Sequence, residues 1–273
     1  MKHQLMSKKI SLVMILLLFF NSSYSNMIKR VHFDNAKSQP GYMNTISEKD
    51  LQAVTMLDDR ILSIYKNNGS YCLGTTKLVA TSSGYFSNCF DNENTLGNKV
   101  SSIYLDKKHQ HLLLVANNKI ASYKISPITF KVNFRISLNE IHEQIIQSKM
   151  SGNNLYILTH DENLNKSSFL VYSMDKDGNI KQIDKQSLDY TPYKFKISEN
   201  KDIYIQSKNN IYKYSSILSG EILKSQEIIN LPTNAIINDF DIKKHDRGFY
   251  IVVAFKEVNE NMNTENGYMN IYN

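Results

Sequence analysis

The stretch Asp202–Ile217 reads DIYIQSKNNIYKYSSI and contains two apolar runs separated by a short polar segment. Ile203 and Ile205 recur with a period of two, which is typical of a β-strand. The segment Lys208–Asn210 holds two asparagines, which tolerate the left-handed backbone that a short hairpin turn needs. We therefore predict a β-hairpin whose return strand begins at Ile211.

Similar hairpins recur along the chain. Their first strands begin 43 to 51 residues apart, at Ile61, Leu112, Leu155, Ile203 and Phe249. The return strands repeat an apolar-x-x-Tyr motif at Ile120/Tyr123, Phe169/Tyr172, Ile211/Tyr214 and Met269/Tyr272. Only the first unit departs from this motif, with Tyr71–Gly74 in its place. Periods of about 40 to 50 residues made of short strands are typical of propeller blades. The sequence thus predicts an all-β fold, a β-propeller of about five four-stranded blades.

The repeats divide the chain into a signal segment and one domain. The signal covers residues 1–25, and residues 26–50 supply a closing strand and a connector ahead of the repeats. We place the five repeats at about residues 51–98, 99–139, 140–190, 191–234 and 235–273. The segment Asn139–Met150 is ambiguous, because its isoleucines also suit one face of a short helix.

The first residues have the features of a secretory signal. Three lysines precede the apolar run Ile10–Phe20, and Ser23 and Ser25 place small residues where a signal peptidase cleaves. An apolar run of this length is far shorter than the ~20 residues that span a bilayer. We therefore expect an exported protein, periplasmic, on the cell surface or secreted, without integral membrane association after cleavage.

The net charge gives no support for nucleic-acid binding. The full chain carries 32 Lys and Arg against 26 Asp and Glu, a net charge of +6. Removal of residues 1–25 takes away three lysines and no acidic residue, so the net charge falls to +3. A basic patch of the kind that binds nucleic acid is therefore not expected.

The last repeat lacks a fourth strand in the sequence. A sheet that is one strand short leaves an unpaired edge. The segment Ile28–Phe33 resembles the fourth strands of other repeats, and we expect it to pair with Tyr268–Tyr272 and complete the fifth blade. The alternatives are a fragment whose last blades are missing, or an open array.

Cys72 and Cys89 are the only two cysteines, and both lie in the first repeat. In an exported protein such a pair predicts a disulfide bond. The alternative is a pair of buried free thiols, because strand geometry can prevent the bond.

The connections between strands vary in length, and the longest ones suggest a binding face. In a four-stranded blade, the second-to-third turn and the connection to the next blade open on the same side. The expanded connections 87–98, 160–167 and 256–267 would therefore share one face. Together they carry the candidate binding residues Asp91, Glu93, Asp161, Glu162, Glu257, Glu260 and Glu265. Elaborated loops on a rigid scaffold often bind partners, and the alternative is that they are solvated insertions.

Other chemical motifs are weak. Asp175–Asn179 resembles the start of a calcium loop, but Ile180 and Gln186 stand where such a loop needs glycine and a carboxylate, so a hairpin turn is predicted. The histidines are scattered without metal-binding spacing, and neither Gly-x-Ser-x-Gly nor a phosphate-binding glycine loop occurs. We predict no catalytic residue, no metal site and no cofactor.

The repeat pattern over about residues 51–273 resembles the broad β-propeller superfamily. The chain has no Trp and no Gly-Gly pair, so it lacks the markers of tryptophan-aspartate, quinoprotein and kelch repeats. It is similar instead to the loosely patterned propellers of the bacterial surface-layer and lactonase-like groups, a likeness of architecture only.

Two functions follow as expectations. The first is a non-enzymatic binding or scaffold protein that holds a protein or carbohydrate partner on its acidic, loop-rich face. The alternative is a lactonase-like or other metal-dependent hydrolase with its site in the central channel. Several Asp, Glu, Asn or His side chains around one point would favour the hydrolase, and a lysine-filled or apolar channel would favour binding. An inert structural product is a third possibility.

Overall fold

A computed structural model describes residues 51–57, 60–77, 86–126, 128–215, 226–245, 248–259 and 264–272. These residues form five antiparallel sheets, four with four strands and one with three. In each sheet, strands that follow one another in the chain are hydrogen-bonded neighbours. We call the sheets blades one to five in chain order.

The strand bounds of the first three blades are as follows. Blade one contains β1 (Leu51–Leu57), β2 (Arg60–Asn67), β3 (Ser70–Lys77) and β4 (Phe86–Asn92). Blade two follows the short helix α2 (Glu93–Leu96) and contains β5 (Val100–Asp106), β6 (His111–Ala116), β7 (Lys119–Ile125) and β8 (Val132–Glu140). Blade three contains β9 (Gln144–Ser151), β10 (Asn154–Asp161), β11 (Lys166–Met174) and β12 (Ile180–Leu188).

The last two blades complete the described chain. Blade four contains β13 (Lys194–Ile197), β14 (Ile203–Gln206), β15 (Asn210–Tyr214) and β16 (Gln226–Asn230). Blade five contains β17 (Ala235–His245), β18 (Gly248–Asn259) and β19 (Thr264–Tyr272). The predicted fourth strand of blade five, Ile28–Phe33, lies outside the described residues, as does the predicted signal segment.

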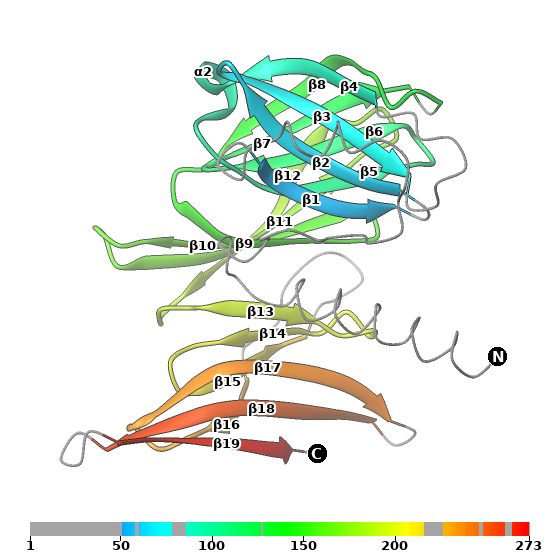
Figure 1. The fold of residues 1–273 in the computed structure, drawn as a ribbon. Helices are drawn as coiled ribbons and strands as arrows, with labels where there is room; N and C mark the ends of the chain where they lie inside the picture. The colour runs from blue at the N-terminus through cyan, green and yellow to red at the C-terminus, as the bar shows by residue number, and fades with distance from the viewer. Residues whose placement is uncertain are drawn as a thin grey trace, which may run out of the picture.

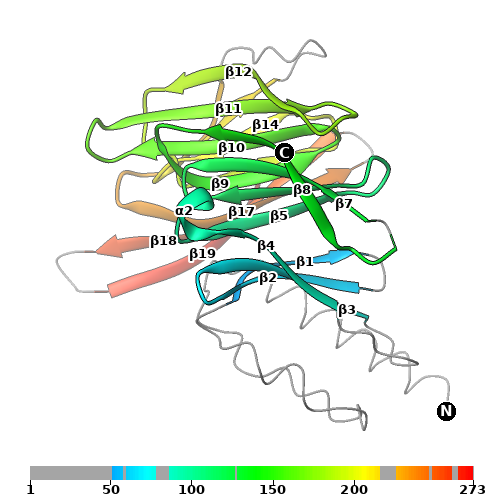
Figure 2. The ribbon, with the colours of Figure 1, turned by 90° about the horizontal axis from the view of Figure 1, so that it is seen from above.

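The blades follow one another through the molecule in chain order (Figure 1). The first strands of neighbouring blades lie close together, β1 beside β5 and β9 beside β13. Seen from above, blade three runs from β9 in the interior to β12 at the periphery (Figure 2). This is the arrangement of a β-propeller, in which each blade packs its two faces against its neighbours.

The hydrophobic core lies between the blades, and the strand β6 shows why. Leu112 and Leu114 are fully buried in the cluster shared with blade one. Leu113 and Val115 point to the opposite face and are buried in the cluster shared with blade three. Successive side chains of a strand point to opposite faces of its sheet. A strand in a blade that packs against neighbouring blades on both faces therefore needs an uninterrupted apolar run. This is the run from which the sequence repeat was recognised.

One ambiguous segment is resolved, and one local prediction was wrong. The segment Asn139–Met150 contains no helix, because Asn139 and Glu140 end β8 and residues 144–150 belong to β9. The turn at Lys208–Asn210 does not use the left-handed backbone either; Ser207 N donates to Asn210 O over 2.9 Å there. Left-handed asparagines occur instead at the equivalent turns of blades one and two, at Asn68 and Asn117.

The predicted disulfide bond between Cys72 and Cys89 is confirmed. The two residues are direct partners in the register of β3 and β4, at a point where the pairing shifts by one residue. The bond therefore joins the third and fourth strands of blade one, β3 and β4. Strand geometry, which we considered as an obstacle, here brings the two sulfur atoms together.

Candidate functional site

The second-to-third turns and the connections between blades lie on one side of the molecule, which we call the loop face. Backbone hydrogen bonds join them in pairs. Glu93 N donates to Gly69 O over 3.1 Å, and Asn117 N donates to Lys99 O over 3.0 Å. Further bonds of this kind link Ile141 N to Asn118 O, Leu231 N to Asn209 O and Val258 N to Asn234 O. The loop face comprises residues 68–69, 93–99, 117–118, 141–143, 162–165, 189–193, 207–209 and 231–234.

The three segments predicted to be expanded do open on this face. Figure 1 shows α2, the tip of the β10–β11 hairpin and the adjoining ends of β18 and β19 along the same side of the molecule. They contain less loop than predicted. β4 continues to Asn92, β10 and β11 leave only residues 162–165 as a turn, and β18 continues to Asn259. Longer strands, which the sequence pattern did not resolve, account for most of the extra length.

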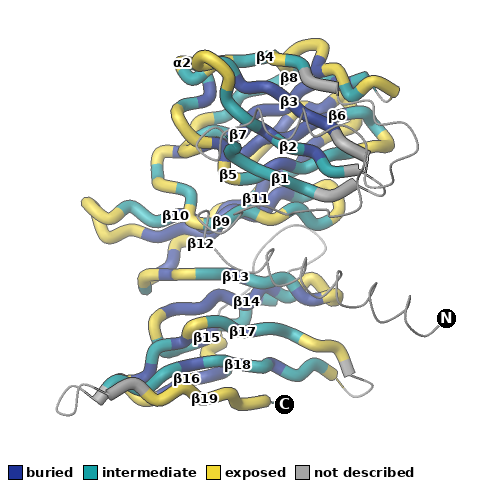
Figure 3. Tube along the Cα trace, in the orientation of Figure 1, coloured by how far each residue is buried: buried dark blue, intermediate teal, exposed yellow. Residues whose placement is uncertain are grey.

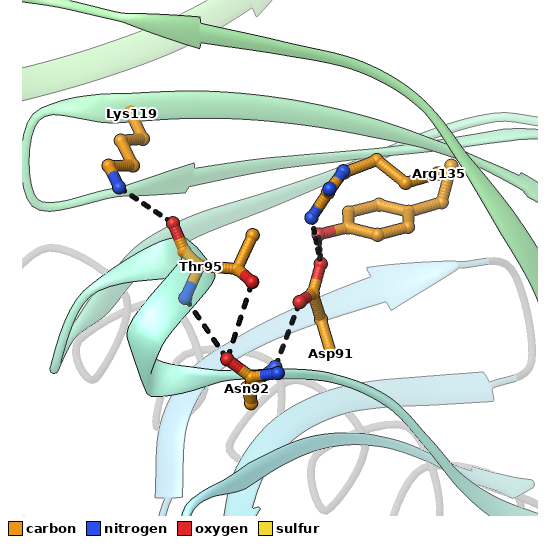
Figure 4. Close-up of polar contacts among 6 residues, drawn as sticks. Asp91, Asn92, Thr95, Lys119 and Arg135 are labelled. Atoms are coloured by element: carbon orange, nitrogen blue, oxygen red, sulfur yellow. Dashed lines mark hydrogen bonds and ion pairs between the residues drawn. The ribbon is translucent and has the colours of Figure 1, made fainter.

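The helix α2 is capped by the residue before it (Figure 4). Asn92 Oδ1 accepts hydrogen bonds from Thr95 N over 3.1 Å and from Thr95 Oγ1 over 3.3 Å. Lys119 Nζ donates to Thr95 O over 2.8 Å from the neighbouring blade. An asparagine cap satisfies an otherwise unpaired amide at the first turn. The connection between blades one and two is therefore fixed at both ends.

Asp91, predicted as a binding-face residue, is a link between blades. Its side chain is only 7% exposed, and its Oδ2 accepts hydrogen bonds from Arg135 Nη1 over 3.0 Å and from Tyr123 Oη over 2.7 Å. Its Oδ1 accepts from Asn92 N over 2.9 Å. Burial, followed by the hydrogen bond to Asp91, raises the pKa of Tyr123. Both carboxylate oxygens of Asp91 thus already have partners within the protein (Figure 4).

Glu93 lies at the start of α2 with its side chain 40% exposed, and it forms an ion pair with Lys66. A carboxylate in the first turn of a helix interacts favourably with the helix dipole. Burial, and then the charge of Glu93, raises the pKa of the nearby Tyr71 to about 12. Tyr71 Oη donates to Gly97 O over 2.6 Å at the other end of the helix. Glu93 therefore faces solvent while α2 is tied to β3.

The β10–β11 hairpin carries two of the predicted acidic residues. Asp161 Oδ1 accepts hydrogen bonds from Asn163 N over 2.9 Å and from Leu164 N over 3.1 Å, an arrangement that closes the turn. Glu162 is exposed in the turn. Leu164 is 63% exposed at the same tip, and sequence analysis did not select it. A large apolar residue inside a polar turn was the signal that could have identified it.

The remaining candidates belong to blade five. Glu257 lies in β18, where it pairs with Ala235 of β17 and with Asn266 of β19. Glu265 lies in β19 opposite Val258. Glu260 lies outside the described residues. The structure therefore places the six described candidates on three separate hairpins and connections of one face, and does not gather these six into a single cluster.

Tyrosines make up a second feature of the loop face that sequence analysis missed. Tyr190 stacks on Tyr212 with ring centres 4.2 Å apart, and its hydroxyl lies 2.9 Å from that of Tyr214. Tyr193, in the same connection between blades three and four, is 54% exposed. Exposed aromatic residues beside rigid neighbours are frequent anchors of protein interfaces.

The Asp175–Asn179 segment, which resembled a calcium loop, is the turn between β11 and β12. Asp175 Oδ1 accepts from Asp177 N and from Asn179 N, each over 2.9 Å, and Gly178 has a φ of +87°. A side chain at Gly178 would meet Ile136 at 2.5 Å, so glycine is required by both the backbone and the packing. The turn lies on the side opposite to the loop face.

In the described ranges, no three His, Cys, Asp or Glu side chains come together as metal ligands. The same part of the chain holds no helix with the length and apolar character of a membrane span.

Comparison with known proteins identifies the fold. No protein-family model and no curated protein matches the sequence. Hydrazine synthase from Kuenenia stuttgartiensis matches with a TM-score of 0.54 at 11% identity, over 86% of this chain and 66% of that one. A putative 6-phosphogluconolactonase from Bacteroides uniformis matches with a TM-score of 0.51 at 12% identity, over 80% and 73%. Virginiamycin B lyase from Staphylococcus aureus matches with a TM-score of 0.46 at 11% identity, over 80% and 69%. The first two matches are β-propeller proteins, and at these identities they show the β-propeller fold alone.

Proposed function

We propose that this protein is an exported, non-enzymatic binding protein that holds a protein or carbohydrate partner on its loop face. The observation that carries the proposal is the position of the blade-specific segments. α2, the β10–β11 tip and the extended β18–β19 hairpin differ from their counterparts in other blades, and all three open on one side. The packed sheets beneath hold them in fixed positions, which lowers the entropy cost of binding.

The exposed side chains of this face support recognition of a partner. Glu162 and Leu164 lie together in one hairpin turn, and Leu164 is 63% exposed. Tyr193 adds an aromatic ring that is 54% exposed. A carboxylate beside an apolar side chain in one turn, with an aromatic ring elsewhere on the same face, suits a partner that presents both hydrogen-bond donors and apolar surface.

Ion pairs between the first strands of blades four and five also support a binding protein. Lys194 Nζ on β13 lies 2.7 Å from Asp239 Oδ1 on β17, and Lys196 Nζ lies 3.0 Å from Asp241 Oδ1. Because lysines engage both aspartates, neither carboxylate is free to serve as a ligand of the metal ion that the hydrolase alternative requires.

Export rests on the sequence of residues 1–25 and is supported by the disulfide bond. Disulfide bonds persist in oxidising compartments and are rare in the cytosol. The Cys72–Cys89 bond is therefore compatible with a protein that functions outside the cytosol. Fractionation of producing cells, with detection of the processed chain, tests this part separately.

The binding proposal is tested by comparing two faces of the same molecule. Three proteins are compared: the processed chain, the loop-face variant Glu162→Lys/Leu164→Ala and the control Asp177→Lys. Each is applied in solution to a glycan array, and each is also immobilised and exposed to the secreted protein fraction. Asp177 is exposed in the β11–β12 turn on the opposite side. We expect a ligand retained by the wild type and by the control but lost from the loop-face variant. Equal retention by all three proteins would contradict the proposal.

A further inference from the structure

The first strands of the blades are joined by polar side chains at equivalent positions. Tyr104, Lys149, Lys196 and Asp241 occupy the same place in successive blades, since they pair with Leu113, Tyr156, Tyr204 and Val252 of the second strands. Two residues earlier on each first strand, a second set of equivalent positions is occupied by Ser102, Gln147, Lys194 and Asp239. Between most blades these positions form direct links.

Blades two and three are linked by hydroxyl groups. Ser148 Oγ lies 3.0 Å from Tyr104 Oη and 2.9 Å from Ser102 Oγ. Blades four and five are linked by the two ion pairs of Lys194 with Asp239 and of Lys196 with Asp241. Each of these links joins a side chain on one first strand to a complementary group on the next.

The link between blades three and four is incomplete. Gln147 Oε1 accepts a hydrogen bond from Phe195 N over 2.7 Å, so the Gln147 position does link the two blades. At the other position the equivalent residues of the two adjacent strands β9 and β13 are Lys149 and Lys196. Two ammonium groups therefore occur where the next pair of blades has an ammonium and a carboxylate. No hydrogen bond or ion pair joins the Lys149 ammonium to another residue in the described part of the chain.

The local charges are unbalanced in the same place. Partial burial, and then the positive charge of Lys196, lowers the pKa of Lys149, while Asp241 acts in the opposite direction. Asp241 is already shared by Lys196 and by Lys243, whose Nζ lies 2.8 Å away. Burial acts to raise the pKa of Asp241, but hydrogen bonds from Lys243 and Lys196 outweigh it and lower the pKa to about 2. Two lysines thus already pair with this carboxylate, and Lys149, which pairs with neither aspartate, remains accessible to solvent.

We propose that Lys149 and Lys196 bind an oxyanion, the phosphate or carboxylate group of a ligand, between the first strands of blades three and four. The anion would supply the negative charge that Asp239 and Asp241 supply in the next pair of blades. Two lysines on neighbouring rigid strands can each donate a charge-assisted hydrogen bond to the same group. This site is on the first strands and is independent of the loop-face proposal.

The first experiment measures anion binding to the processed chain by calorimetry. Inorganic phosphate and succinate are titrated separately at constant ionic strength, and the two arms distinguish a preference for phosphate from one for carboxylate. We expect saturable binding of at least one anion, weakened at least tenfold by Lys149→Gln. Lys244→Gln is the matched control, because Lys244 pairs with the exposed Glu199 instead. No saturable binding, or equal weakening by both variants, would overturn the proposal.

The second experiment replaces the anion with a side chain. Lys149→Glu places a carboxylate opposite Lys196 and should restore the missing link within the protein. We expect a higher melting temperature than Lys149→Gln in the absence of phosphate, and no further increase when phosphate or succinate is added. If Lys149→Glu still responds to the anion as the wild type does, Lys149 is not part of the site.

Discussion

Blades three and five are built from the same kind of hairpin, but their surroundings differ. In β10 of blade three, Leu155 and Ile157 are buried against blade two, while Tyr156 and Leu158 are buried against blade four. In blade five the buried residues of β18 face blade four, and β19 at the sheet edge leaves Ile271 68% exposed. Figure 3 shows this contrast as dark interior strands against an exposed β19.

The difference shows that a blade gains most of its stability from its neighbours. The hydrogen bonds of the β10–β11 and β18–β19 pairs are equivalent, since both pairs are regular antiparallel ladders. What distinguishes them is the apolar area removed from water, worth about 25 cal/mol per Å². A blade packed on both faces therefore contributes more to the global stability than a blade whose buried residues face only one neighbour.

The largest expected effect contrasts two isoleucines. Ile157 is fully buried between blades two and three, and Ile271 is 68% exposed on β19. We expect Ile157→Ala to lower the free energy of unfolding by about 2–5 kcal/mol, and Ile271→Ala to change it by less than about 0.5 kcal/mol. Urea denaturation of both variants measures this difference. Similar losses would mean that the blades are not stabilised by packing between them.

Blade one, at the other end of the described array, has a covalent bond between its outer strands. We expect the double variant Cys72→Ala/Cys89→Ala to lose roughly 3 kcal/mol of stability, because the unfolded chain gains freedom when the loop is opened. Thermal unfolding with and without a reducing agent measures the effect. The reducing agent should lower the melting temperature of the wild type alone; an unchanged wild type would contradict a stabilising bond.

A smaller effect is expected at the polar link between blades one and two. Asp91→Ala leaves Tyr123 Oη and the Arg135 guanidinium without their shared acceptor, which costs about 1–3 kcal/mol for a buried group. The matched control is Asp177→Ala, an exposed aspartate in the β11–β12 turn. Denaturation of both variants should show a loss only for Asp91. Equal stability would place Asp91 outside the structural framework and return it to the candidate binding residues.

The smallest effect is a pH dependence. His111 on β6 is 1% exposed, and its Nδ1 has no hydrogen-bond partner in the described structure. Burial and then Lys124 and His109 lower its pKa below 6.5, against the opposing charges of Asp106 and Asp175. Below pH 6.5 the unfolded chain therefore binds a proton that the folded chain resists, so stability falls as the pH drops towards the folded-state pKa.

Urea denaturation between pH 7.5 and 5 measures this decline in the wild type and in His111→Leu. The loss of stability on acidification should be smaller in the variant, which has no imidazole to protonate. A parallel decline in the two proteins would exclude His111 as its source.

The repeat could be recognised from the sequence because packing on both blade faces demands continuous apolar runs such as Leu112–Ala116. The disulfide bond could also be predicted, because the chain has only two cysteines that could form it. The contacts of the charged side chains were harder to predict from the sequence. Asp91 appeared to belong to a loop, and its pairing with Arg135, 44 residues away, depends on the packing of two blades. The equivalence of Lys149 and Lys196 likewise requires the register of the first strands, because sequence periodicity leaves strand boundaries uncertain by about 2–4 residues.

The most direct test of this account concerns β19, the edge strand of blade five among the described residues, which we predict to pair with Ile28–Phe33. Hydrogen exchange of the β19 amides is compared between the chain 26–273 and a chain that begins at Leu51. We expect the amides of β19 that point away from β18 to exchange slowly in the longer chain and rapidly in the shorter one. Rapid exchange in both chains would contradict the closing strand and leave blade five with three strands.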